Sequence, residues 1–97
     1  ILDDSENQDI VVFGAGKWGH RILNVLLQNE SKIKGICDNS RELQKSEING
    51  YEIISVEKAV NRFPKALFLI ANQKNKEDMK QQLLKMGMEE KNILTFL

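Results

Sequence analysis

Three glycines at the end of an apolar segment form the most informative pattern of this chain. Residues 10–19 read I-V-V-F-G-A-G-K-W-G, which places Gly14, Gly16 and Gly19 at G-x-G-x-x-G spacing. Between a strand and a helix, the first glycine permits a tight turn, the second lets the backbone approach a phosphate, and the third lets the helix pack on the strand. Backbone N–H groups at the start of the helix then face the anion. The spacing predicts a phosphate-binding turn.

An acidic residue at a suitable distance strengthens this interpretation. Asp38 stands 19 positions after Gly19 and follows a second apolar segment, residues 33–37. An acidic residue about 20 positions after the glycines, at the tip of the second strand, binds a ribose hydroxyl in dinucleotide sites. Its charge would repel a 2′-phosphate within about 4 Å by roughly 1 kcal/mol in water. NADP is therefore disfavoured, although Arg41 weakens the argument. The alternative is that Asp38 caps the turn over residues 39–41.

The glycine turn does not fit the other common phosphate motif, G-x-x-x-x-G-K-[ST]. His20 and Arg21 stand where that motif needs its lysine and its serine or threonine. Lys17 is either a phosphate-binding charge or a solvated lysine, and both roles stay open. His20, directly after the third glycine, either donates a hydrogen bond to a phosphate or is an ordinary surface residue. For Trp18 we favour packing on its neighbours over stacking on a base.

Side chains for catalysis are scarce. The chain has one histidine, one tyrosine and one cysteine, so neither a metal cluster nor a Cys–His pair on adjacent elements is indicated. Tyr51 is followed four positions later by Ser55, so the Tyr-x-x-x-Lys pair of short-chain reductases is missing. Cys37 lies within an apolar segment and is predicted to be a small buried hydrophobe. The pattern favours holding a nucleotide over transforming one.

Alternating apolar segments predict the elements that position these residues. Strands are expected over residues 10–14, 32–38, 66–71 and 93–97, with a hairpin at Asn49–Gly50 and a short strand over 51–54. One helix follows the glycines and ends near Asn29. A second is capped by Ser55, and a third, over 76–85, ends at Gly87.

This alternation predicts a parallel sheet in which strand 32–38 lies beside 10–14, followed by 66–71 and 93–97. The winding direction reverses between strands 10–14 and 66–71, and open α/β sheets bind ligands at such a point, outside the carboxyl ends of the strands. The candidate ligand-binding residues at these ends are Gly14, Ala15, Gly16, Lys17, Trp18, Gly19, Asp38, Asn39, Ala71 and Asn72.

Size and composition limit the organisation and the partners. Ninety-seven residues, 41% of them hydrophobic, allow one small domain over residues 9–97, after a polar lead-in over 1–8 that we expect to be flexible. Fourteen basic and fourteen acidic residues cancel, so neither nucleic acid nor a membrane surface is an expected partner. No apolar segment is long enough for membrane insertion. The single cysteine fits the cytoplasm, and the start at Ile1 suggests a piece of a longer protein.

Several segments together resemble a known domain. They are V-V-F-G-A-G-K-W-G, G-I-C-D-N-S, I-N-G-Y-E-I-I-S, A-L-F-L-I-A and K-M-G-M-E-E-K-N-I-L. They resemble the small Rossmann-like, NAD(P)-binding-like domain of bacterial surface-polysaccharide enzymes, such as the N-terminal nucleotide-sugar-binding domain of sugar N- and O-acyltransferases. The corresponding domain of nucleotide-sugar dehydratases and epimerases is also similar. The resemblance implies a three-layer α/β sandwich with a mainly parallel sheet of four to five strands.

The resemblance also implies roles for particular residues. Gly14, Gly16 and Gly19 are expected to approach a diphosphate, and Asp38 and Asn39 to border the nucleoside. The ligand stays open, because members include apparent UDP-sugar binders, NAD-type binders and copies without a known ligand. In the acyltransferases, catalysis belongs to a separate left-handed β-helix domain, whose hexapeptide repeats this sequence lacks.

The leading hypothesis is an accessory domain that binds a small-molecule nucleotide, above all a nucleotide sugar such as a UDP-sugar. It would belong to a bacterial transferase or related protein of polysaccharide or glycoconjugate synthesis, with catalysis in an attached domain. One alternative is the NAD-binding half of an oxidoreductase or sugar epimerase. Another is a structural or dimerising domain with an empty loop, so a homo-oligomer stays among the alternatives.

Overall fold

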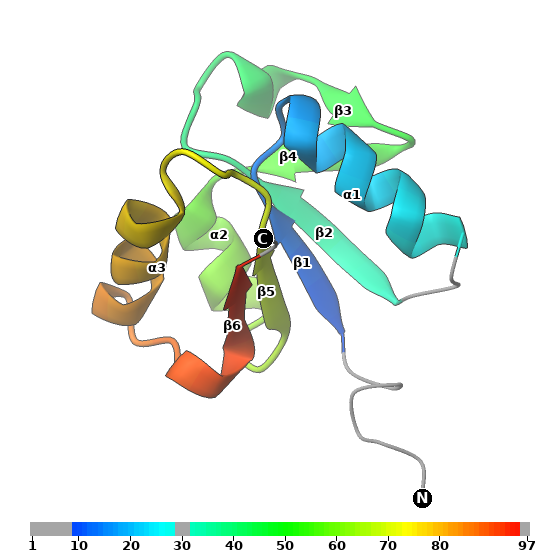
Figure 1. Cartoon of the computed structure of the whole chain (residues 1–97). Coiled ribbons are helices and arrows are strands. Elements are labelled where there is room, and N and C mark those ends of the chain that lie inside the picture. The colour runs from blue at the N-terminus through cyan, green and yellow to red at the C-terminus, as the bar shows by residue number, and fades with distance from the viewer. Residues whose placement is uncertain (1–8, 29–31, 96–97) are drawn as a thin grey trace, which may run out of the picture.

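The computed structural model describes residues 9–28 and 32–95 of the chain. These residues form six strands and three helices (Figure 1), with single 3₁₀ turns over Leu43–Lys45 and Glu90–Asn92. In chain order the elements are β1 (Ile10–Phe13), α1 (Lys17–Gln28), β2 (Ile33–Cys37), β3 (Glu47–Ile48), β4 (Tyr51–Ile54), α2 (Val56–Arg62), β5 (Leu67–Ile70), α3 (Lys76–Lys85) and β6 (Ile93–Thr95). The predicted lead-in, the predicted helix end near Asn29 and residues 96–97 of the last predicted strand lie outside the described residues.

The six strands form one sheet in the order β3-β4-β2-β1-β5-β6. The order of the four main strands confirms the prediction, and every pairing among β4, β2, β1, β5 and β6 is parallel. The sheet is wider than the four to five strands expected. Strand β4 pairs with β2, with Ile36 opposite Ile53 and Cys37 opposite Ile54. The sixth strand is β3, which pairs antiparallel with β4 across a tight turn at Asn49 and Gly50.

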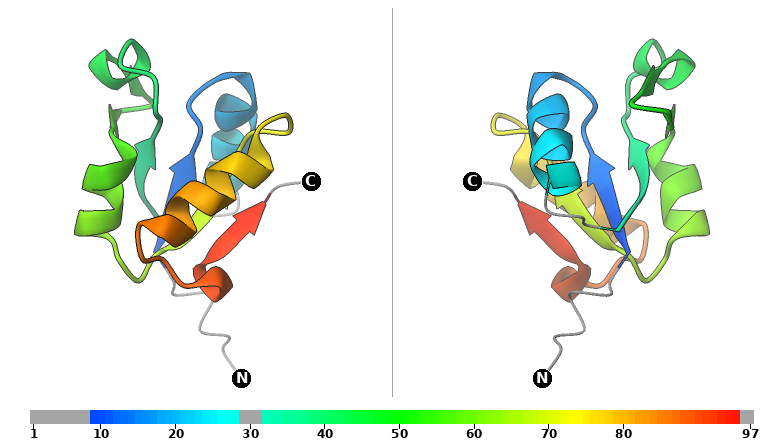
Figure 2. Two further views of the ribbon diagram at one scale, coloured as in Figure 1. Left: turned by 90° about the vertical axis from the view of Figure 1, so that its left-hand side faces the viewer. Right: turned by 90° about the vertical axis from the view of Figure 1, so that its right-hand side faces the viewer.

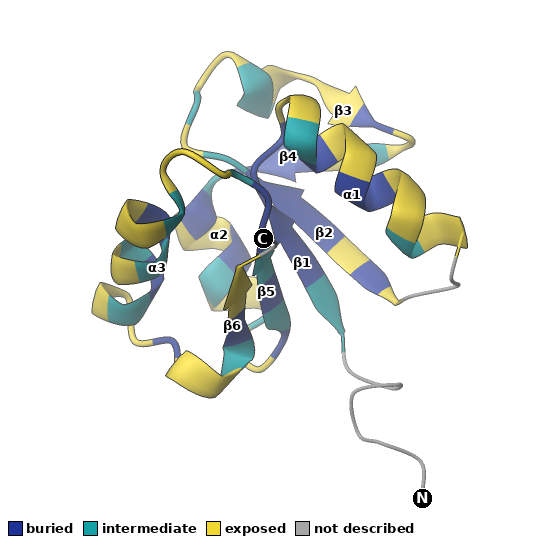
Figure 3. Cartoon of the chain, viewed as in Figure 1, coloured by how far each residue is buried: buried dark blue, intermediate teal, exposed yellow. Residues whose placement is uncertain are grey.

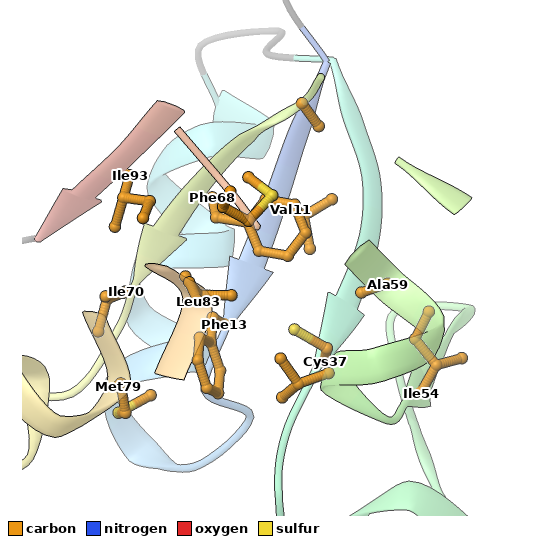
Figure 4. Close-up of a cluster of buried hydrophobic side chains, with 13 residues drawn as sticks. Val11, Phe13, Cys37, Ile54, Ala59, Phe68, Ile70, Met79, Leu83 and Ile93 are labelled. Carbon is orange, nitrogen blue, oxygen red and sulfur yellow. The ribbon is translucent and has the colours of Figure 1, made fainter. Parts of the chain in front are cut away.

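Helix α1 covers one face of the sheet, and α2 and α3 cover the other (Figure 1). The central strand β1 contributes to both cores: Val11 and Phe13 pack on the side of α2 and α3, and Val12 on the side of α1. Figure 4 shows the first of these clusters. In Figure 3, β1 and β2 are mostly buried, with one exposed residue in β2, Lys34, while the outer sides of the helices are exposed. A strand buried on both faces explains why this segment is continuously apolar.

The ends of two helices follow the local sequence. The Ser55 hydroxyl oxygen accepts a hydrogen bond of 3.1 Å from the Lys58 N–H at the start of α2, which confirms the predicted cap. After α3, Gly87 has a φ of 96°, and the Met88 N–H donates to the Leu83 carbonyl oxygen across 3.1 Å. This left-handed turn confirms that Gly87 ends the helix. Among the described residues, no helix combines the length and hydropathy that a membrane crossing requires.

Cys37 is completely buried in the cluster beneath α2 and α3, which agrees with a structural role. Burial, with a smaller contribution from the adjacent Asp38 carboxylate, raises the pKa of the Cys37 thiol far above its ordinary value. Below pH ~8.5 the thiol is neutral in both the folded and the unfolded chain, so its contribution to stability is intact. Above that pH only the unfolded chain releases the proton.

We therefore expect the free energy of unfolding to fall as the pH rises above ~8.5, by up to about 1.4 kcal/mol per pH unit from this group. Urea unfolding of the wild type and of Cys37→Ala between pH 7 and 10 measures the effect. The variant should lose less stability over this range, because other titrating groups contribute equally to both proteins. If the free energy of unfolding changes with pH equally in both proteins, the raised pKa of Cys37 is contradicted.

Candidate functional site

The carboxyl ends of β1, β2 and β5 lie side by side, as the sequence predicts. The Gly14 N–H donates to the Cys37 carbonyl oxygen and the Ala71 N–H to the Phe13 carbonyl oxygen, each across 2.8 Å. These bonds bring residues 14–19, 38–39 and 71–72 to one edge of the sheet, at the top in Figures 1 and 2. We call it the carboxyl edge. All ten candidate residues named from the sequence come from it.

The three glycines of the turn meet different constraints. Gly14 has a φ of 123°, and a Cβ there would lie 2.9 Å from the Ala71 carbonyl oxygen. A Cβ on Gly19 would overlap the Gly14 carbonyl oxygen, because α1 packs directly on the turn. At Gly16, which is exposed, a Cβ would meet no atom within 4 Å. The fold thus explains Gly14 and Gly19, whereas nothing in the described structure explains Gly16.

Backbone N–H groups lie next to Gly16 at the start of α1. The first bond of the helix runs from the His20 N–H to the Gly16 carbonyl oxygen, across 3.0 Å. The N–H groups of Lys17, Trp18 and Gly19 come before it and meet no acceptor in the described part of the chain. Such groups, with the positive end of the helix dipole, attract anions. The exposed Lys17 ammonium pairs with no carboxylate of residues 9–28 or 32–95, so both of its predicted roles stay open.

Asp38 connects the end of β2 to the glycine turn. One carboxylate oxygen accepts from the Ser40 N–H across 2.7 Å, which is the turn-capping role named as the alternative. The other accepts from the Ala15 N–H across 2.8 Å. The sequence reasoning missed this second contact. Each carboxylate oxygen keeps a further lone pair, so these bonds are compatible with the predicted ribose contact, which stays a prediction.

We expect Asp38→Asn to destabilise the domain by about 1–2 kcal/mol, since an amide supplies one acceptor oxygen and turns its NH₂ group toward the other backbone N–H. The expected loss of stability is no larger than this because the Asp38 side chain is only half-buried. Urea unfolding at pH 7 measures the loss, with Glu42→Gln as the control, because Glu42 is an exposed carboxylate nearby in the chain. Equal stability of the two variants would contradict the role of Asp38 in holding the turn.

The side chains of Asn39 and Asn72 are both engaged within the protein. Asn39 and Gln82 of α3 exchange two amide hydrogen bonds, of 2.8 and 2.9 Å. The Asn72 Oδ1 accepts from the backbone N–H groups of Lys74 and Asn75, across 2.9 and 2.8 Å, just before α3. The structure therefore gives both residues a role in positioning α3. Whether they also border a ligand stays a prediction.

Trp18 packs against the apolar cluster on the α1 side of the sheet. The Arg21 guanidinium lies 5.1 Å from the centre of its ring, a distance at which a cation and an aromatic face attract each other. The packing agrees with the role favoured from the sequence. Whether the Trp18 backbone N–H binds a ligand stays a prediction.

Groups able to do acid–base or nucleophilic chemistry are few at the carboxyl edge. No three histidine, cysteine, aspartate or glutamate side chains of the described residues are placed to hold a metal ion. Cys37 is buried, and Tyr51, at the start of β4, packs against the apolar cluster on the α1 side of the sheet. His20 is exposed at the first turn of α1. The arrangement can bind an anion, and it shows no nucleophile paired with a base.

Solved structures share this fold. RSP, a Rex-family repressor, superposes with a TM-score of 0.74 and 25% identity over 93% of this chain and 45% of its own. RSP in complex with beta-NADH gives a TM-score of 0.70 and 25% identity, over 93% of this chain and 46% of that chain. The chain thus spans about half the length of RSP.

A second protein of known structure has the same fold at lower identity. UDP-D-quinovosamine 4-dehydrogenase from Vibrio fischeri gives a TM-score of 0.69 and 21% identity, over 93% of this chain and 78% of that chain. No curated protein sequence matches this chain. The fold is therefore Rossmann-like, and the likeness is not specific to sugar acyltransferases.

The family assignment rests on the sequence as a whole. The model of the family described as C2185-like, N-terminal, matches residues 6–94. This match includes the glycine turn, Asp38, Ala71 and every strand of the sheet except the last residue of β6. The chain belongs to the C2185-like family and corresponds to its N-terminal domain.

Proposed function

We propose that this domain binds a nucleotide through its diphosphate at the first turn of α1. The observation that carries the proposal is the space at Gly16, where a side chain would meet nothing within 4 Å. Three backbone N–H groups without an acceptor in the described structure follow this glycine. A diphosphate placed there would accept hydrogen bonds from them and would interact favourably with the helix dipole.

Two classes of ligand share this chemistry, NAD(H) and nucleotide sugars. RSP supports NAD(H), since it is 25% identical to this chain and was solved with beta-NADH. The resemblance of the sequence to nucleotide-sugar-binding domains supports a UDP-sugar. Our first version of the proposal is that the ligand is a nucleotide sugar and that this is an accessory domain of a protein of surface-polysaccharide or glycoconjugate synthesis. Catalysis would then belong to an attached domain.

The second version of the proposal is that the ligand is NAD(H) and that this domain is the NAD-binding half of an oxidoreductase or epimerase. The Asp38 carboxylate lies at the end of β2 and is held by the Ala15 and Ser40 N–H groups. A 2′-phosphate beside it would meet a fixed negative charge. NADP is therefore expected to bind more weakly than NAD in either version of the proposal.

Thermal unfolding with a panel of UDP-sugars, NADH, NAD, NADP and coenzyme A tests the proposal. A ligand at 100 times its Kd adds about 2.7 kcal/mol, which raises the Tm of a domain of this size by roughly 10 °C or more. Stabilisation by UDP-sugars supports the first version, and stabilisation by NADH or NAD alone supports the second and overturns the first. No stabilisation by any of them would contradict nucleotide binding and favour a structural or dimerising domain.

A further inference from the structure

The single histidine of the chain, His20, lies at the proposed site and contacts Gly16. Its Nδ1 is 3.0 Å from the Gly16 carbonyl oxygen, the atom that also accepts the His20 backbone N–H. A carbonyl oxygen only accepts hydrogen bonds, so Nδ1 must carry the hydrogen. The neutral ring is therefore the Nδ1–H tautomer, and its Nε2 has a lone pair that no donor of the described residues engages.

The His20 ring lies against Gly16 at the first turn of α1. Side chains of an α-helix lean toward the N-terminus of the helix, and the contact with Gly16 places the His20 ring against the first turn. Gly16 is also the position whose missing side chain leaves the surroundings open. A phosphate bound by the N–H groups of this turn would thus lie beside an imidazole with one nitrogen unused.

We propose that His20 is a proton-dependent ligand of the diphosphate, an inference that rests on the proposed function. On binding, Nε2 takes one proton from solvent and donates it in a hydrogen bond to a phosphate oxygen, while Nδ1–H stays on the Gly16 carbonyl. No covalent bond between heavy atoms changes, and the complex holds one proton more than its free partners. Because imidazole gains its proton near neutral pH, binding strengthens as the pH falls from 8 to 6.

No carboxylate of the described residues pairs with His20, so the negative charge that would balance a protonated His20 ring comes from the ligand. Lys17 and Arg21 of the same helix are cationic, and the Arg21 guanidinium lies over Trp18. At the carboxyl edge, Asp38 accepts from two backbone N–H groups, and Lys74 after β5 is exposed and cationic. In residues 9–28 and 32–95, His20 forms no ion pair with a carboxylate.

Nitrogen-detected NMR of the ring tests the inference directly, because the chain has only one histidine. In the free protein at pH 8 we expect a protonated Nδ1 and an unprotonated Nε2. Saturation with a UDP-sugar or NADH at pH 7 should move the Nε2 signal toward that of a protonated nitrogen. A protonated Nε2 in the free protein at pH 8 would overturn the inference.

Variants supply the second readout. His20→Ala is expected to bind the nucleotide about ten-fold more weakly than wild type at pH 6, because it lacks one charge-assisted hydrogen bond. At pH 8.5 the two proteins should bind equally. Asn24→Ala, an exposed change one turn further along α1, is the control and should match wild type at both pH values. Binding with no change in the Nε2 signal overturns this inference alone, whereas no binding by wild type overturns the proposed function as well.

Discussion

Replacing Gly19 with alanine is expected to lower the Tm of the domain by about 12–24 °C. The added Cβ would overlap the Gly14 carbonyl oxygen and lie 2.9 Å from its carbon. Both are backbone atoms of a buried turn, so no rotamer change relieves the overlap, and α1 must move away from β1. Overpacking of this kind costs about 3 kcal/mol, and each kcal/mol lowers the Tm of a domain of this size by about 4–8 °C. Thermal unfolding followed by circular dichroism measures the shift.

Gly16→Ala is the matched control for this prediction. It adds the same methyl group three positions earlier, where no atom lies within 4 Å and φ is not positive. Gly16 immediately precedes the first residue of α1, where alanine is a poorer helix cap than glycine, so we expect this change to cost no more than about 1 kcal/mol. A Gly19→Ala variant as stable as Gly16→Ala would contradict the close packing of α1 on the glycine turn.

Gly16→Val is expected to weaken nucleotide binding by about 30-fold or more while leaving the fold intact. The valine side chain would occupy the space in which the phosphate meets the helix N–H groups, and the loss of a central contact in a binding site costs about 2 kcal/mol or more. Stability should stay within about 1 kcal/mol of wild type, because the side chain is exposed and only the cap of α1 is weakened. Titration calorimetry measures the affinity, and urea unfolding measures the stability.

A valine at an unrelated exposed position controls for surface effects. Gln28→Val lies at the last residue of α1, three turns away from the glycine turn, and should bind the nucleotide as wild type does. If Gly16→Val binds as tightly as Gln28→Val, the nucleotide does not approach the backbone at Gly16. Gly14→Val, by contrast, should damage the fold, because of the positive φ and the contact with Ala71.

Local patterns predicted most of the architecture. The apolar segments, the glycine turn, the Ser55 cap and the Gly87 helix end depend on residues close in sequence, and the structure confirms each of them. The parallel order of the four main strands followed from the alternation of strands and helices. The number of strands was underestimated by one, because β3 has only two residues, Glu47 and Ile48, and forms a strand by pairing with β4.

The candidate site was predicted as a set of residues but not as a network of contacts. The bond between Ala15 and Asp38 joins residues 23 positions apart, and the pair Asn39–Gln82 joins residues 43 positions apart. Neither spacing matches a known motif, and Gln82 was absent from the candidate residues. The open space at Gly16 was anticipated by the G-x-G-x-x-G motif, since the motif assigns each glycine a physical reason.

The backbone amide signals of the glycine turn test the central claim most directly. In a ¹H–¹⁵N correlation spectrum of the wild-type domain, titration with a UDP-sugar or NADH should shift the amides of Gly16, Lys17, Trp18 and Gly19 most strongly. The Ala15 amide should shift less, because it already donates to Asp38. Saturable shifts of the four amides are the predicted result. Unchanged amides at millimolar ligand, or saturable shifts confined to residues away from the carboxyl edge, would contradict nucleotide binding at this turn.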